Sequence, residues 1–408
     1  MLLAVAAVAL SACGTKSSAI PPSAPTTVAL PAPVTAAPSA PVPAKYQAMF
    51  DQTSRDLDAY AAAITAMPTY STSAASQVGF GELLDANGNR QGELLMPAAM
   101  TGVDQSLDAF KRLGVRGVVV GVKLPLLLPT YTPQAGQYAD FWSAVADHAR
   151  ARGFTVDVEL GPLFCGTTYS QCSYHYPTTV VGWADLTAQQ ARTVLDQIHP
   201  DYLDLLSEPN TEANLTGIRE LQSVTGVTDF VKEALARIGA HGDTKLLAGA
   251  ASWFGPVYDE AIARTGVDGL VTHIYPANAS TAANLVATAR VAHDANLPFI
   301  ADEVWLYKGT TTAAGNVQAS NGEGFLNTFS FWEPLDVRFM QATRQWAAKA
   351  GSTLLSGFWS WQTQAYLTWT PALDATPIAR VLLDSAAAAA SAMTAVTFTQ
   401  TGLALVGR

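Results

Sequence analysis

The sequence predicts an α/β fold with a single (β/α)8 barrel, because eight short segments rich in β-branched residues alternate with longer segments of helical periodicity. Parallel strands joined by helical crossovers give this alternation, and eight such units match a closed barrel better than an open sheet. The expected strands are 77–83, 115–122, 154–160, 201–207, 244–250, 268–274, 297–303 and 353–360. The expected helices are 103–113, 136–152, 185–198, 215–239, 256–265, 281–295, 333–350 and 374–393.

Glycines and composition mark the ends of the elements and of the domain. Gly153, Gly266 and Gly351 stand just before the third, sixth and eighth expected strands, where a preceding helix needs a C-terminal stop. Pro, Ala, Ser and Thr dominate the early part of the chain, which therefore cannot bury an apolar face and is expected to stay extended. We expect a linker at 13–45, the barrel domain at 46–395 and a C-terminal tail at 396–408.

The first residues are typical of an export signal. An apolar run over 1–12 ends in Leu10-Ser11-Ala12-Cys13, with small residues before the cysteine. This tetrapeptide resembles the bacterial lipobox, which implies a lipid on Cys13 and a chain anchored to a membrane of the cell envelope, facing outside the cytoplasm. No Lys or Arg precedes the apolar run, so a simple secretory signal or a fortuitous apolar start remain alternatives.

Composition excludes one class of partner. Lys and Arg number 23 against 33 Asp and Glu, and phosphate binding needs a basic face, so nucleic acid is not expected as a partner. Beyond the N-terminus we expect no apolar stretch of the ~20 residues that a membrane span needs. The folded part is expected to be a water-soluble monomer.

Two cysteines follow the third expected strand. Cys165 and Cys172 lie in one predicted loop, and such a pair in an oxidising compartment predicts a disulfide. A metal site would need further ligands nearby, and His175 alone does not supply them. We therefore expect no metal and no cofactor.

Polar and aromatic residues gather where expected strands end. In a (β/α)8 barrel the active site lies at the carboxyl ends of the strands. Strand four ends in Ser207-Glu208-Pro209-Asn210, strand six in His273-Ile274-Tyr275, strand seven in Asp302-Glu303-Val304-Trp305 and strand eight in Phe358-Trp359-Ser360-Trp361. These residues are expected to meet at one rim.

Together these motifs resemble glycoside hydrolase clan A, the superfamily of retaining TIM-barrel glycosidases that includes family 5. The resemblance implies a general acid/base at Glu208, a nucleophile at Glu303, sugar-site residues at His273 and Tyr275, and a sugar-site floor at Trp359 or Trp361. The clan has Asn where this sequence has Ser207, so the contact with the sugar 2-hydroxyl is weaker, water-mediated or supplied from elsewhere. The exact family and the sugar therefore stay open.

The chemistry explains why two glutamates are needed. A glycosidic bond breaks through an oxocarbenium-like state, which needs a proton for the leaving oxygen and a carboxylate for the anomeric carbon. We expect the pKa of Glu208 to be raised by burial and by the charge of Glu303, and hydrogen bonds, for instance from Tyr275, to keep Glu303 ionised. Retention requires carboxyl groups ~5–5.5 Å apart. The expected reaction is hydrolysis of a β-linked oligo- or polysaccharide by double displacement.

Four more side chains are candidates for lining the site. Glu82, Lys123 and Glu159 end strands one, two and three, and Trp305 follows strand seven. Sugar rings pack their C–H faces on indole. The alternatives are an ion pair or polar packing at the barrel mouth for the charged residues, and plain core packing for the tryptophan.

Three other functions stay open from sequence. A solute-binding lipoprotein would bind sugar without catalysis, but it predicts two lobes and a hinge and gives no reason for glutamates after the fourth and seventh strands. A metal-dependent barrel hydrolase lacks a His-x-His motif after the first strand. A barrel that has lost its activity would still be expected to show this fold.

Overall fold

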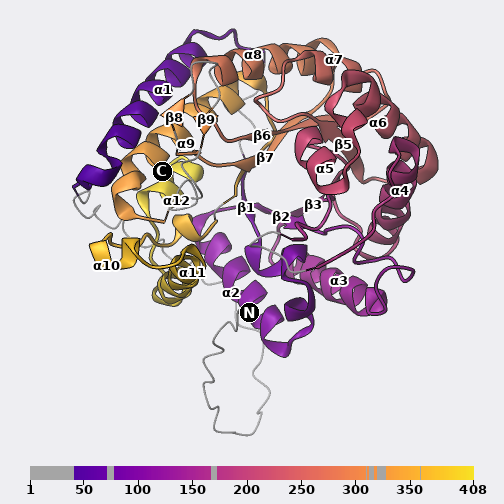
Figure 1. Ribbon diagram of the computed structural model, residues 1–408, viewed down its shortest axis with the longest axis horizontal. Helices are drawn as coiled ribbons and strands as arrows, with labels where there is room; N and C mark the ends of the chain where they lie inside the picture. Colours follow the sequence, from indigo (N-terminus) through magenta and orange to yellow (C-terminus); the bar gives the residue numbers. More distant parts are fainter. Residues whose placement is uncertain are drawn as a thin grey trace, which may run out of the picture.

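The structure is a computed structural model that describes residues 41–70, 78–166, 172–308, 310–311, 317–318, 328–358 and 360–408. Among these residues, eight parallel strands close into a barrel in the order β1-β10-β7-β6-β5-β4-β3-β2 (Figure 1). The strands are β1 (Val78–Glu82), β2 (Gly117–Gly121), β3 (Thr155–Glu159), β4 (Tyr202–Asp204), β5 (Lys245–Gly249), β6 (Gly269–Ile274), β7 (Phe299–Val304) and β10 (Leu354–Gly357). Each overlaps an expected strand, so the predicted (β/α)8 barrel is confirmed. Cys13, most of the linker and Trp359 lie outside the described residues.

Helices form the outer layer of the barrel (Figure 1). They are α1 (Gln47–Ala66), α2 (Pro97–Leu113), α3 (Ala135–Ala151), α4 (Val180–Gln197), α5 (Pro209–Thr216), α6 (Val224–Ile238), α7 (Val257–Ile262), α8 (Ala279–Asp294), α9 (Glu333–Ala350), α10 (Pro371–Asp374), α11 (Ile378–Ala395) and α12 (Gln400–Leu405). The helix expected at 215–239 is two helices, α5 and α6, because Gly217 ends α5 with a left-handed φ of 80°. A further pair of short strands, β8 (Thr310–Thr311) and β9 (Val317–Gln318), is antiparallel.

Glycine ends several helices as expected. Gly153, Gly266 and Gly351 all have positive φ, and Gly351 is the left-handed C-cap of α9. Only glycine takes this conformation without steric cost. These three stops set where the chain turns back into strands β3, β6 and β10.

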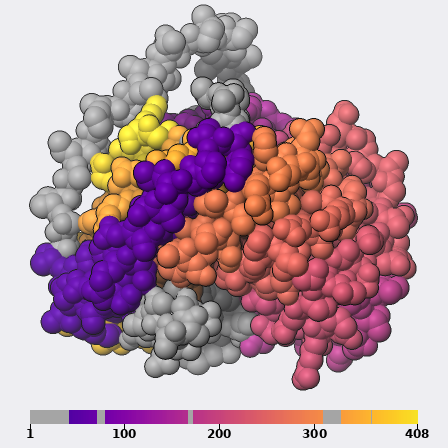
Figure 2. Space-filling view, turned by 90° about the horizontal axis from the view of Figure 1, so that it is seen from above, coloured from indigo at the N-terminus to yellow at the C-terminus, as the bar shows by residue number. Residues whose placement is uncertain are grey.

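Segments from the two ends of the described chain pack together and close the barrel. Val78 of β1 pairs with Leu354 of β10. Helix α1 packs along α9 and α8. In Figure 2 it is the indigo segment that lies against orange segments from later in the chain. The expected C-terminal tail contains α12, whose Leu405 is fully buried against Gly79 of β1. The barrel domain therefore continues past residue 395.

Helix α11 is more apolar than we expected of any segment beyond the N-terminus. Its 18 residues have a mean hydropathy of 1.2, and by length and composition it could cross a membrane. Its buried residues Ala389 and Met393 pack on Ala109 of α2. Such a composition alone is weak evidence for a span.

The barrel interior changes character from one end to the other. At the amino ends of the strands it is filled by an apolar cluster of Phe80, Val119, Leu247, Val271, Ile300 and Leu354. Toward the carboxyl ends the inward positions hold acids, because side chains two residues apart on a strand face the same side. Asp302 thus follows Ile300, and Asp204 follows Tyr202, which packs on the apolar cluster. The polar end of the interior is where the candidate site lies.

Candidate active site

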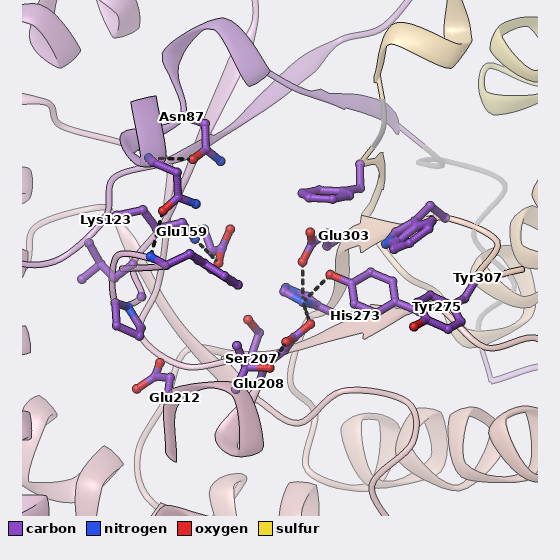
Figure 3. A pocket seen from close by; sticks show the side chains of 18 residues that line it. Asn87, Lys123, Glu159, Ser207, Glu208, Glu212, His273, Tyr275, Glu303 and Tyr307 are labelled. Carbon is purple, nitrogen blue, oxygen red and sulfur yellow. Dashed lines mark hydrogen bonds and ion pairs between the residues drawn. The ribbon is translucent and has the colours of Figure 1, made fainter. Parts of the chain in front are cut away.

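A pocket of about 260 Å³ opens at the carboxyl ends of the strands, as expected for the fold. It is lined by Asn87, Asn89, Lys123, Glu159, Leu160, Gly161, Pro162, Phe164, Ser207, Glu208, Thr211, Glu212, His273, Tyr275, Glu303, Trp305, Tyr307 and Phe358 (Figure 3). Eight residues singled out from sequence are among them: Lys123, Glu159, Ser207, Glu208, His273, Tyr275, Glu303 and Trp305. The motifs at separate strand ends therefore converge on one cavity.

Three elements position the two central glutamates. Glu208 is the N-cap of α5, directly after the β4 segment, and Pro209 at the first helical position fixes the turn. Glu303 lies on β7, and the register between β6 and β7 shifts before the pair His273 and Glu303. This irregularity brings Glu303 into the pocket although its neighbour Asp302 also faces the barrel interior.

One imidazole links the two carboxyl groups (Figure 3). Nδ1 of His273 lies 2.8 Å from Oε1 of Glu208 and 2.6 Å from Oε2 of Glu303. The three ligand-type atoms all lie within 4.8 Å of one another. The hydroxyl of Tyr275 lies 3.3 Å from the same nitrogen. The nearest oxygens of the two carboxyl groups are thus close to the separation that retaining glycosidases use.

The pKa order of the two glutamates is the reverse of the one expected from sequence. Burial alone would raise the pKa of Glu208, but hydrogen bonds from His273 and from the hydroxyl of Thr211 hold it below its usual value. Burial raises the pKa of Glu303 to about 7, against the lowering by His273, and the charges of Glu159 and Glu208 add to the rise. The site without substrate therefore keeps its shared proton on Glu303, because Glu208 has the additional Thr211 donor.

A second charged cluster forms the opposite wall. Nζ of Lys123 donates to Oε1 of Glu159 at 2.7 Å, and both side chains are largely buried. Glu82 lies behind them, fully buried, with Nδ2 of Asn87 3.3 Å from its Oε1. Burial and the charge of Glu159 raise the pKa of Glu82 well above its usual value. The ion pair expected as an alternative for Lys123 and Glu159 forms, and it forms inside the pocket.

Aromatic rings make the third wall. Tyr275 stacks on Trp253 with ring centroids 5.2 Å apart and an interplanar angle of 25°, and it also contacts Trp305 and Phe358. Trp361 does not belong to this wall. The 3-10 turn over Ser360–Thr363 directs its ring outward, where it packs on Ala109, Ala389 and Met393. The expectation that Trp361 forms the floor of the sugar site is therefore wrong, and Trp359 lies outside the described residues.

Sequence reasoning missed several pocket residues. Glu212 of α5 is 5% exposed, and Nε1 of the buried Trp183 donates to its Oε2 at 2.6 Å. Burial raises the pKa of Glu212 to about 8, although Trp183 lowers it. The spacing of Glu208 and Glu212, one helical turn apart after a strand end, was the available signal. Phe164, Asn87 and Asn89 lie in loops that carry no comparable pattern.

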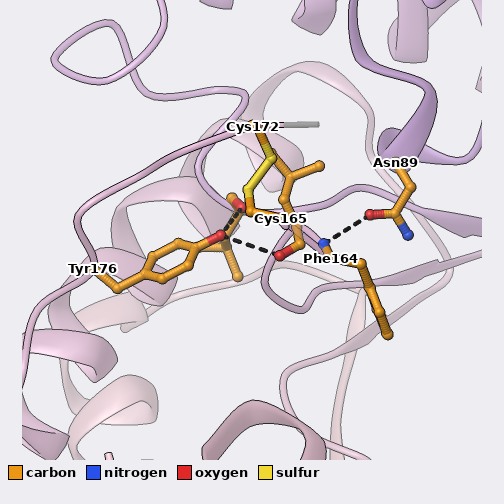
Figure 4. The surroundings of a disulfide bond; sticks show 7 residues. Asn89, Phe164, Cys165, Cys172 and Tyr176 are labelled. Carbon is orange, nitrogen blue, oxygen red and sulfur yellow. Dashed lines mark hydrogen bonds between the residues drawn. A yellow bond between two sulfur atoms is a disulfide. The ribbon is translucent and has the colours of Figure 1, made fainter. Parts of the chain in front are cut away.

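A disulfide joins two described residues after β3, beside Phe164 of the pocket lining (Figure 4). Cys165 and Cys172 are joined, as the sequence predicts. The adjacent Phe164 lines the pocket, and its backbone N–H donates to Oδ1 of Asn89 at 3.0 Å. The hydroxyl of Tyr176 donates to the carbonyl of Leu124 at 3.3 Å. The cross-link and these hydrogen bonds hold one pocket wall in place.

Acids and His273 also gather below the pocket floor. Asp204, His273 and Asp302 have ligand-type atoms within 4.8 Å of one another, as do Glu208, His273 and Glu303. In the second group Nδ1 lies within hydrogen-bonding distance of both glutamates. These distances fit hydrogen bonds within that group.

Known structures share the barrel at low sequence identity. No protein-family profile and no curated protein matches the sequence. The exo-β-1,4-mannosidase Op5Man5 from Opitutaceae bacterium strain TAV5 is similar over 80% of this chain at 14% identity with a TM-score of 0.51, and this chain spans 62% of its length. A family 1 β-glucosidase from Thermotoga maritima is 12% identical over 72% of this chain and 86% of its own, with a TM-score of 0.43. A fungal β-1,4-galactanase is 14% identical over 62% of this chain and 80% of its own, with a TM-score of 0.40. The first of these similarities shows the (β/α)8 barrel fold, and the two with lower TM-scores add no argument to it.

Proposed function

We propose that this protein is a retaining glycoside hydrolase that cleaves β-linked oligo- or polysaccharide by double displacement. The observation that carries the proposal is the pair Glu208 and Glu303, whose oxygens lie within 4.8 Å of one another in a pocket at the carboxyl ends of the strands. Retaining enzymes place the two carboxyl groups about 5–5.5 Å apart, because one must reach the anomeric carbon while the other reaches the leaving oxygen. Inverting enzymes leave room for a water, about 6.5–9.5 Å.

Each glutamate has one role in each half of the reaction. Glu303 attacks the anomeric carbon and forms a glycosyl ester, while the proton of Glu208 passes to the departing oxygen. Glu208, now a carboxylate beside His273, then takes a proton from water as that water attacks the ester and releases Glu303. The positions after strands four and seven support these roles.

The pKa order in the empty pocket requires one proton shift as the bond breaks. The proton must move from Glu303 to Glu208, and both contact Nδ1 of His273 at hydrogen-bonding distance. Positive charge developing on the sugar beside Glu303 favours its ionised form, since an opposite charge a few ångströms away lowers a carboxyl pKa by about 1–3 units. The transition state thus favours the required distribution.

The charged residues that line the pocket indicate whether the substrate carries a charge. Among the described lining residues the cations are Lys123 and His273, and both already contact carboxyl groups. Glu212 adds another carboxyl group to the lining. The segments outside the described residues between positions 71 and 359 contain no Lys, Arg or His. An acidic sugar would find no cation to pair with, so we propose that the substrate is uncharged.

The test is turnover of aryl β-glycosides and β-linked polysaccharides by the barrel domain. The panel includes mannosides, glucosides and galactosides, and matched uronides. We expect one neutral glycoside to be hydrolysed, its uronide to be inert, and the first-formed sugar to keep the β configuration by NMR. An α product would contradict the double displacement, and sugar binding without turnover would favour the binding-protein alternative.

We also propose that the chain is exported, lipid-anchored to the cell envelope and monomeric. The support is the Leu10-Ser11-Ala12-Cys13 sequence and a disulfide of the kind that persists in oxidising compartments. In a bacterial host, labelled fatty acid should be incorporated into the full chain and not into Cys13→Ser. Label on both variants would overturn the anchor at Cys13.

A further inference from the structure

The imidazole of His273 connects the pocket with the closed interior of the barrel. Nδ1 faces Glu208 and Glu303 at the pocket. Nε2, on the other side of the ring, is 3.5 Å from Oδ1 of Asp302 and is a buried nitrogen with no hydrogen bond of normal geometry. His273 is only 2% exposed, so bulk solvent does not reach this nitrogen. The carboxyl group that faces it is that of Asp302.

The acids below His273 are an unusual group for a barrel interior. Asp157 on β3, Asp204 on β4 and Asp302 on β7 are at most 1% exposed. Both oxygens of Asp157, both of Asp302 and Oδ2 of Asp204 have no hydrogen-bond partner. Three ionised carboxylates cannot be stable together in such a dry space. Burial raises the pKa of each of the three carboxyl groups.

The ring contacts decide the protonation state of His273. Nδ1 faces two acceptors and therefore carries a hydrogen. A lone pair on Nε2 would point toward the Asp302 carboxyl, and a second proton there replaces that repulsion with attraction. Burial would lower the pKa of His273, but the charges of Glu303 and Asp302 outweigh it and hold this pKa well above its usual value.

We propose that Asp302 is a positioning residue that holds His273 in its doubly protonated form, with the Nδ1 hydrogen between Glu208 and Glu303. This inference rests on the proposed hydrolase function. Asp302 contacts no sugar and acts only through His273. Its effect would be largest in the glycosyl-ester intermediate. There Glu303 has lost its charge and Glu208 has given its proton to the leaving oxygen, so the cation pairs with the new Glu208 carboxylate.

The surroundings of His273 define what the test must separate. The titratable groups that face or interact with it are Glu208 and Asp204 from the β4 segment, Asp302 and Glu303 from β7, Tyr275 after its own strand and Asp157 from β3. Asp302 is the one that lies opposite Nε2 at 3.5 Å. Asp157→Asn is therefore a matched control, because it makes the same change in the same barrel interior.

The first measurement is the pH profile of kcat/KM for Asp302→Asn. Without its counter-charge His273 loses a proton in the assay range, both glutamates lose a neighbouring cation, and the profile moves up by about one pH unit. Asp157→Asn keeps the wild-type profile. A profile that stays in place or moves to lower pH means that His273 remains charged without Asp302, and this result would overturn the proposal.

The second measurement does not depend on activity. Nitrogen-15 NMR of labelled histidine is expected to show both ring nitrogens of His273 protonated from pH 5 to 8 in the wild type, and a titration in this range in Asp302→Asn. A lone pair on Nε2 in the wild type would overturn the proposal even if the variant does not fold. One equivalent of metal in the purified protein would also overturn it, since the ion would occupy Nε2. If the wild type hydrolyses no glycoside, the proposed function fails while this spectrum still tests the role of Asp302.

Discussion

Two clusters of carboxyl groups lie at the same pocket, and each surrounds one basic side chain. Glu82 and Glu159 surround Lys123 on the side of strands β1 to β3. Glu208 and Glu303 contact His273 on the side of β4, β6 and β7. The first cluster presents Glu159 to the pocket and keeps Glu82 behind it, whereas the second presents both of its glutamates.

The difference separates binding from chemistry. Glycoside cleavage needs a protonated and an ionised carboxyl at the same bond, and only the His273 cluster offers two carboxyl groups to one ligand. In the Lys123 cluster, burial would lower the pKa of the lysine, but the charge of Glu159 outweighs this and holds the ammonium in its charged form. Within the proposed function, the Lys123 side would hold substrate and the His273 side would carry the chemistry.

The largest expected effect is on the nucleophile. Glu303→Ala removes the group that forms the ester, so kcat should fall on the order of 10⁴-fold or more on every substrate. Glu260→Ala on α7, away from the pocket lining, should keep full activity. The measurement is single-turnover kinetics with an aryl glycoside and with the natural linkage. Equal losses in the two variants would break the assignment.

The next effect depends on the leaving group. Glu208→Ala should lose about 10²–10⁴-fold on a natural linkage and much less on an activated aryl glycoside, whose leaving group needs little protonation. Azide should accelerate this variant and give a β-glycosyl azide, because a small anion attacks the ester without base catalysis. A β-glycosyl azide formed by Glu303→Ala, together with an inverted azide formed by Glu208→Ala, would exchange the two roles.

Substitution of Lys123 is expected to lower both the stability of the fold and the affinity for substrate. Lys123→Met leaves Glu159 buried without its ion pair, which costs about 3 kcal/mol or more of unfolding free energy. Lys308→Met is the matched control, because Lys308 is also buried in an ion pair, with Asp336, outside the pocket lining. Denaturant unfolding should show losses in both variants, while only Lys123→Met raises KM. A fall in kcat of Lys123→Met at unchanged KM would place Lys123 in the chemistry instead.

The smallest effect concerns pH. The proposed reaction needs one proton on the pair Glu208 and Glu303. In the empty pocket Glu303 holds this proton with a pKa of about 7, so kcat/KM should fall about tenfold per pH unit above that value. Because this pKa lies above the ordinary glutamate value of 4.5, the folded state also loses stability as pH rises from about 4.5 through 7. Glu303→Gln should lack that loss in thermal unfolding. A kcat/KM that stays constant from about pH 7 to 9 would contradict the raised pKa.

The barrel and both glutamates could be predicted because short signals decide them. Strand alternation indicates the eight strands, Glu303 lies at the carboxyl end of β7, and Glu208 lies between β4 and α5. Their pKa order was not predictable, since it depends on Thr211, one helical turn beyond Glu208, reaching the carboxylate. Trp361 was misplaced for a similar reason. A single 3-10 turn after β10 reverses the direction of its ring, and no periodicity in the sequence reports that turn.

Polar pocket residues outside the strand ends could also not be predicted from the sequence. Glu212 looks like an ordinary exposed helical acid until the indole of Trp183, from α4, is seen to cover it. Sequence reasoning could place three acids on strands but not on one face of the sheet, because a one-residue change of register moves a side chain to the other face. These acids are Asp157, Asp204 and Asp302. Only the closed barrel shows that they meet below His273.

The pairing of β1 with β10 affects how the protein can be made. The barrel closes only when Val78 pairs with Leu354, so β1 lacks one of its two neighbouring strands during most of synthesis. Contacts between such distant positions form slowly, because a long loop must be closed before they are rewarded. A nascent chain of this kind keeps one barrel edge open until its last strand is made, and it needs protection from aggregation until then.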